Sequence, residues 1–118
     1  MSREISLETV QQLVAGLHPA LVLEILPPEH YAREHLPGAL NLPLNGLDAA
    51  AERVIPSQDT PVVTYCSGPT CANSHIAARR LSELGYRDVR VFTGGKSAWR
   101  DAGFVFEHGA GEPVMRSA

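Results

Sequence analysis

The chain has 118 residues, of which 44% are hydrophobic and 19% charged, and its formal net charge is −3. Its length predicts one domain, and its composition excludes an intrinsically disordered protein. The negative charge and the lack of a Lys/Arg-rich patch argue against nucleic acid as a partner. No apolar stretch approaches the ~20 residues of a membrane span, and the first residues lack the apolar core of a secretory signal. We therefore expect a cytoplasmic protein that does not bind membranes.

Apolar runs of strand length alternate with segments of helical periodicity. In chain order, the pattern predicts a helix at 7–16, a strand at 20–25, a helix at 28–35, a strand at 39–42, a helix at 46–53, a strand at 61–65, a helix at 74–84, a strand at 88–92 and a helix at 95–102. Ser6 is placed to cap the first helix, Pro28 suits the first turn of the second, and Gly85 suits the end of the fourth. The alternation indicates an α/β fold, with a parallel sheet covered by helices on both faces.

The segment VVTYCSGPTCANS (62–74) places Cys66 where the strand at 61–65 ends, before the helix at 74–84. Ligands of open parallel sheets bind beyond the carboxyl ends of strands, where loops lead into helix N-termini. If residues 67–72 wrap around the thiol, their backbone N–H groups and the positive end of the helix form an anion site without a side-chain cation. Such a field favours the thiolate, which is the nucleophilic form. We therefore predict a reactive Cys66; the alternative is a buried structural cysteine.

A second cysteine, Cys71, lies in the same loop. It could attack a persulfide or sulfenic acid on Cys66 and close a disulfide, or it could simply pack against the loop. Together with His75, the two cysteines also form a C-x4-C-x3-H pattern. Structural zinc needs four protein ligands, and no fourth lies nearby in the sequence. We therefore predict neither a metal site nor a cofactor.

Three segments together resemble a known family. LVLEILPPEHYAREHLPGALNLPL (21–44), VVTYCSGPTCANSHIAARRLSELGY (62–86) and VFTGGKSAWRDAGF (91–104) are similar to a single-domain rhodanese, a thiosulfate-sulfurtransferase-like protein. The turn HLPGALNLP, the strand-end cysteine and the GG…W..AG segment occur in the family's usual order. The resemblance covers about residues 3–106 of a single domain 1–118, and residues 107–118 are expected to be a C-terminal tail.

The resemblance implies a single rhodanese-like domain with a central five-stranded parallel sheet and helices on both faces. It also implies a sulfurtransferase in which Cys66 accepts a sulfane sulfur from thiosulfate, a polysulfide or a protein persulfide. The resulting Cys66 persulfide would pass this sulfur to a thiol or to cyanide. The implied substrate-binding loop consists of Ser67, Gly68, Pro69, Thr70, Cys71 and Ala72.

The chain departs from the family pattern in three ways. The loop is longer than in typical single-domain members, which implies a wider or differently shaped pocket. The resemblance therefore supports thiosulfate as the donor less strongly than it does for those members. The usual Asp-x-Arg after the second strand reads Glu24-Ile25-Leu26, so an arginine is lost. The related phosphatases use Cys-x5-Arg to bind an oxyanion, but Ala72 stands at that position here, which argues against phosphatase activity. These departures leave two alternatives open: a non-catalytic interaction or regulatory domain, and a thiol-redox protein that uses Cys66 and Cys71.

Overall fold

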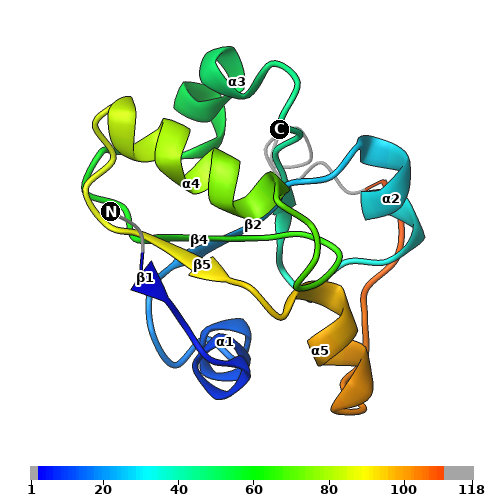
Figure 1. Ribbon diagram of the computed structural model, residues 1–118. Coiled ribbons are helices and arrows are strands. Elements are labelled where there is room, and N and C mark those ends of the chain that lie inside the picture. The colour runs from blue at the N-terminus through cyan, green and yellow to red at the C-terminus, as the bar shows by residue number, and fades with distance from the viewer. Residues whose placement is uncertain (1–2, 111–118) are drawn as a thin grey trace.

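A parallel five-stranded sheet forms the middle layer of the computed structural model, which describes residues 3–110 (Figure 1). The strands are β1 (Arg3–Glu4), β2 (Leu21–Glu24), β3 (Leu40–Asn41), β4 (Val62–Tyr65) and β5 (Val89–Phe92). Their spatial order is β1-β5-β4-β2-β3, so β4 lies at the centre. This arrangement brings the loop that follows β4 to the middle of the carboxyl edge of the sheet.

Helices cover both faces of this sheet (Figure 1). They are α1 (Leu7–Val14), α2 (Pro28–Arg33), α3 (Leu47–Val54), α4 (Asn73–Glu83) and α5 (Gly95–Asp101). The pair α3 and α4 lies on one face, and α1 and α5 lie on the other. None of the helices within residues 3–110 is long and apolar enough to cross a bilayer.

Each face of β4 contributes to a different hydrophobic core, because successive strand side chains point to opposite faces. Val62 packs in the cluster that contains Ala77 of α4. Val63 packs in the cluster that contains Val10 of α1 and Trp99 of α5. Burying β4 on both faces fixes its register, and it therefore fixes the position of the loop that follows it.

The structure confirms the predicted α/β architecture. All nine elements predicted from the pattern are present, with ends that differ by at most two residues. Ser6 caps α1 by accepting a hydrogen bond from the Thr9 N–H at 3.1 Å, and Pro28 is the first residue of α2. Gly85 has φ +105° and directly follows the C-cap residue of α4, Leu84.

The ends of the chain differ most from the pattern. The fifth strand, β1, was not predicted, because it has only two residues and both are exposed. It is defined by pairing with β5, where Arg3 lies opposite Arg90. At the other end, Glu107 forms an antiparallel bridge with His35, so the predicted tail begins in contact with the domain. Residues 111–118 of that tail lie outside the described residues.

Candidate active site

The backbone around Cys66 is held by the start of α5. The Cys66 carbonyl accepts the N–H of Lys96 at 3.0 Å, and the Ser67 carbonyl accepts the N–H of Ser97 at 2.9 Å. These two bonds satisfy N–H groups of the first turn of α5, which have no partner within the helix. They also join the exit of β4 to α5, which comes 30 residues later in the chain.

Gly95 makes this close approach possible. Its φ of +58° lies in the left-handed region, which favours glycine. A Cβ at this position would lie 2.4 Å from the Cys66 carbonyl oxygen and 2.9 Å from the Gly68 nitrogen. Both neighbours are backbone atoms, so neither can swing aside as a flexible side chain would. The second glycine of the GG segment therefore has a steric role beneath the loop.

The loop after Cys66 folds as a compact turn. The Cys71 N–H donates to the Gly68 carbonyl at 3.0 Å, while Pro69 and Thr70 are exposed at the tip. The side chain of Asn73 donates to the Ile25 carbonyl at 3.1 Å and ties the start of α4 to the end of β2. The predicted loop residues 67–72 are thus gathered over Cys66 at the carboxyl edge of the sheet.

Cys66 is only 2% exposed, and its sulfur has polar neighbours. Its thiol donates to the Cys71 carbonyl oxygen at 3.4 Å. Burial raises the pKa of the Cys66 thiol above its ordinary value, the side chain of Cys71 raises it further, and the hydroxyl and backbone N–H of Ser74 act in the opposite direction. The prediction that the loop keeps Cys66 ionised is therefore wrong for the resting protein, because desolvation outweighs the donors at the start of α4.

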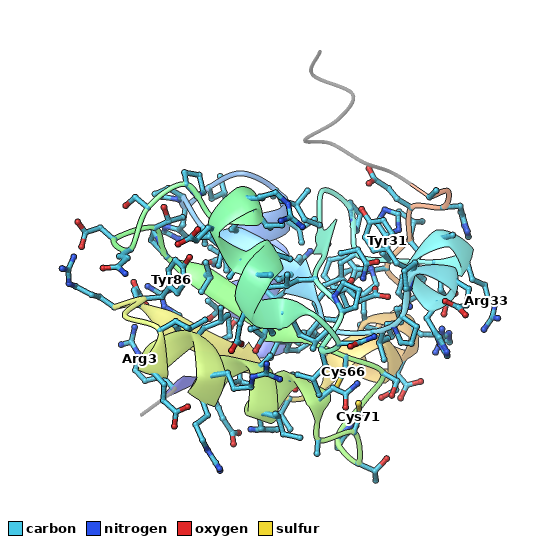
Figure 2. All side chains as sticks on the ribbon, turned by 90° about the horizontal axis from the view of Figure 1, so that it is seen from above. Arg3, Tyr31, Arg33, Cys66, Cys71 and Tyr86 are labelled. Carbon is cyan, nitrogen blue, oxygen red and sulfur yellow. The ribbon has the colours of Figure 1, made fainter. Side chains whose placement is uncertain are left out.

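Cys71 shows the opposite behaviour. Burial raises the pKa of its thiol, but hydrogen bonds from the Cys66 side chain and from the backbone N–H groups of Asn73 and Ser67 more than offset this, so the net pKa is lowered. Cys71 is also partly exposed, and Figure 2 shows it beside Cys66. Several of the donors that we expected around Cys66 thus act on Cys71. Of the two thiols, Cys71 therefore has the lower pKa.

We expect iodoacetamide to alkylate Cys71 faster than Cys66, because Cys71 is both more exposed and more ionised. The Cys71/Cys66 labelling ratio should rise as the pH is lowered through the two thiol pKa values, and it should level off below both. Tandem mass spectrometry of the peptide that contains both cysteines measures this ratio. Equal labelling at every pH would contradict the assigned charge distribution.

A buried ion pair lies next to this loop. The Nζ of Lys96 is 3.0 Å from Oε2 of Glu24, and the two side chains are 7% and 0% exposed. Oε2 of Glu24 has no hydrogen bond of good geometry, so the charge of Lys96 is what compensates it. Glu24 belongs to the Glu24-Ile25-Leu26 segment that lacks the family's arginine. Lys96 was not predicted from the sequence. The one available signal was a lysine in the first turn of α5, on a helix that also buries Trp99.

Tyr65 and α2 complete the surroundings of this pair. The Tyr65 hydroxyl donates to Oε1 of Glu24 at 2.7 Å, and Lys96 Nζ donates to the His30 carbonyl at 3.1 Å. Burial and the negative charge of Glu24 raise the pKa of Tyr65 well above its ordinary value, so this residue stays a neutral donor. Because Tyr65 directly precedes Cys66, the network connects the end of β4 with β2, α2 and α5.

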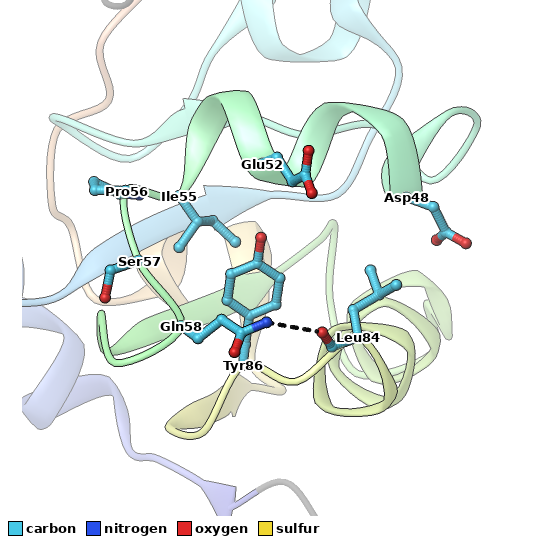
Figure 3. Close-up of a pocket in the computed structure, with 8 residues that line it drawn as sticks. All are labelled: Asp48, Glu52, Ile55, Pro56, Ser57, Gln58, Leu84 and Tyr86. Atoms are coloured by element: carbon cyan, nitrogen blue, oxygen red, sulfur yellow. Dashed lines mark hydrogen bonds between the residues drawn. The ribbon is translucent and has the colours of Figure 1, made fainter.

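A pocket of about 270 Å³ lies far from the cysteines, between α3, the end of α4 and the segment before β4 (Figure 3). Gln58 closes one side by donating to the Leu84 carbonyl at 3.2 Å. Tyr86 lines the pocket just before β5, and Figure 2 shows it at the other end of the molecule from Cys66 and Cys71. The pocket therefore opens at the amino ends of the strands, and we assign it no part in chemistry at the sulfurs.

Within residues 3–110, no three His, Cys, Asp or Glu side chains gather as metal ligands would.

Comparison with known proteins identifies the family. The family model described as "Rhodanese-like domain" matches residues 6–102. The chain belongs to the rhodanese-like domain family. The predicted resemblance is confirmed, and the match includes Cys66, the loop after it and Gly95.

Relatives of this rhodanese-like chain include catalytic and regulatory proteins by name. A protein named sulfurtransferase from Allochromatium vinosum is 31% identical over 84% of this chain and 89% of its own length. The HTH-type transcriptional regulator Rv0324 of Mycobacterium tuberculosis is 34% identical over 75% of this chain, which spans 38% of that protein. The crystal structure of thiosulfate sulfurtransferase from Pseudomonas aeruginosa has a TM-score of 0.79 at 29% identity, and it covers 91% of this chain and 20% of its own. The chain thus spans well under half of the latter two proteins.

Proposed function

We propose that this rhodanese-like domain is a sulfurtransferase that carries a sulfane sulfur as a persulfide on Cys66. The observation that supports this most directly is the position of the Cys66 thiol at the carboxyl end of β4, directly before the loop that leads into α4. Ser74 lies in the first turn of α4, where the helix dipole favours negative charge. We assign the domain to about residues 3–106 and the substrate-binding loop to residues 67–72.

The reaction has two displacement steps. The Cys66 thiolate attacks the sulfane sulfur of thiosulfate, a polysulfide or a protein persulfide, and the electron pair of the broken bond leaves with the donor. A thiol or cyanide then attacks the outer sulfur of the persulfide, and the electron pair returns to the Cys66 sulfur. The Ser74 donors favour the Cys66 thiolate, so they increase the fraction of nucleophile in the first step and stabilise the leaving sulfur in the second. We also propose that the protein acts in the cytoplasm, where thiols are kept reduced.

Intact-mass measurement tests this function. The protein is incubated with thiosulfate or with a polysulfide and separated from excess donor. Its intact mass is then measured by mass spectrometry. We expect the mass of one added sulfur atom, its loss on addition of cyanide, and no gain in Cys66→Ser. Thermal unfolding of Cys66→Ser like that of the wild type shows that the variant is folded. If no donor adds sulfur to the wild-type protein, the sulfurtransferase proposal fails, and the non-catalytic alternative is favoured.

A further inference from the structure

The two cysteines of the active-site loop occupy different depths. Cys66 is 2% exposed, whereas Cys71 is partly exposed on the loop above it. The Cys66 thiol donates to the Cys71 carbonyl oxygen at 3.4 Å, so the two residues are in direct contact. A sulfur atom added to Cys66 therefore starts beside Cys71. Because Cys66 is almost fully buried, an acceptor as large as a folded protein meets Cys71 before it meets Cys66.

We propose that Cys71 is a relay thiol that takes the sulfane sulfur from the Cys66 persulfide and presents it at the surface to acceptors too large to enter the loop, in particular protein thiols. This proposal rests on the proposed sulfurtransferase function, and it assigns the class of acceptor. It also gives a role to the extra length of the loop, which carries Cys71 over Cys66.

The charges of the pair fit this direction of transfer. The attacking sulfur has to be a thiolate. Burial raises the pKa of Cys71, but hydrogen bonds from Asn73 and Ser67, which do not depend on a free Cys66 thiol, lower it. The leaving sulfur is that of Cys66. The backbone N–H and hydroxyl of Ser74 stabilise the negative charge that this sulfur regains. The nucleophile and the leaving group are thus each provided with donors of their own.

The relay step balances without any further reagent. The Cys71 thiolate attacks the outer sulfur of the Cys66 persulfide and forms a new S–S bond. The bond between the outer sulfur and Cys66 breaks, and its electron pair stays on Cys66 as a thiolate. The outer sulfur keeps its proton and is now the end of a persulfide on Cys71. Attack on the inner sulfur would instead give a Cys66–Cys71 disulfide and free hydrosulfide, and the disulfide would then need an external reductant.

The test compares two acceptors of different size. Protein loaded from thiosulfate, or from a polysulfide if thiosulfate adds no sulfur, is mixed with cyanide or with a small folded protein that carries one engineered surface cysteine. For each variant, the ratio of the protein-thiol rate to the cyanide rate is measured. In Cys71→Ser we expect this ratio to fall by about tenfold or more, because a positioned nucleophile is lost. Glu83→Gln, an exposed change at the last residue of α4 that removes no thiol and lies outside the loop, serves as the control and should retain the wild-type ratio.

Mapping of the persulfide locates the sulfur directly. After alkylation and tandem mass spectrometry, the relay predicts persulfide on both cysteines of the wild type, only on Cys66 in Cys71→Ser, and on neither in Cys66→Ser. An unchanged rate ratio with persulfide on Cys66 would overturn the relay and leave the sulfurtransferase function intact. Persulfide on Cys71 of Cys66→Ser, or a disulfide with release of hydrosulfide in the wild type, would also overturn it. A wild type that takes up no sulfur overturns both proposals.

Discussion

Replacing Lys96 with methionine is expected to lower the free energy of unfolding by about 3–5 kcal/mol, because it leaves the buried Glu24 carboxylate without its cation. Glu24 is fully buried, and the ion pair with Lys96 at 3.0 Å is what compensates its Oε2 atom. The loss is a large share of the about 5–15 kcal/mol that stabilises a typical domain. Urea unfolding monitored by the fluorescence of Trp99 measures it.

Two further variants separate charge burial from other effects. Arg79→Met removes the same charge from an exposed position on α4, and it should change stability by less than about 0.5 kcal/mol. The double variant Glu24→Gln/Lys96→Met leaves no buried charge, and it should recover most of the loss seen in Lys96→Met. If the stability lost in the double variant equals the sum of the losses in Lys96→Met and in the single variant Glu24→Gln, the pair does not interact as the structure indicates.

The fold could be predicted because local patterns determine most of it. The apolar run before Cys66 and the helical periodicity after it depend only on neighbouring residues, and both elements formed within one residue of the expected ends. β1 could not be predicted in this way. Arg3 and Glu4 carry no apolar signal, and their strand exists only because the edge of β5 offers unpaired backbone groups.

The candidate site could be predicted only in its outline. The sequence located Cys66 at a strand end and Cys71 in the loop above it, because chain order alone fixes these positions. The distribution of charge between the two sulfurs depends on which donors face which sulfur, and that is a property of the folded loop. Lys96 was missed for a related reason. It pairs with Glu24 from α5, 72 residues later in the chain, and no local pattern links the two residues.

The second large effect concerns the contact between the loop and α5. Gly95 combines a left-handed φ of +58° with backbone neighbours closer than any real Cβ allows. An added methyl group would have to displace the Cys66 carbonyl, the Gly68 amide or the first turn of α5. Any of these shifts moves the backbone that carries the reactive sulfur. Gly103 provides the matched comparison, since it has φ +84° and nothing within 4 Å of an added Cβ.

Gly95→Ala is therefore expected to destabilise the domain by about 2–5 kcal/mol, of which the backbone conformation costs about 1–2 and overpacking the rest. The rate of persulfide formation on Cys66 should fall by about 100-fold, because a displacement near 1 Å disrupts the alignment of a nucleophile with its donor. Gly103→Ala should show only the backbone cost of about 1–2 kcal/mol and form the persulfide at the wild-type rate. Urea unfolding and the time course of the intact mass measure the two quantities. If the two variants lose equal stability and equal rate, the loop does not depend on its approach to Gly95, and the steric role assigned to that glycine is wrong.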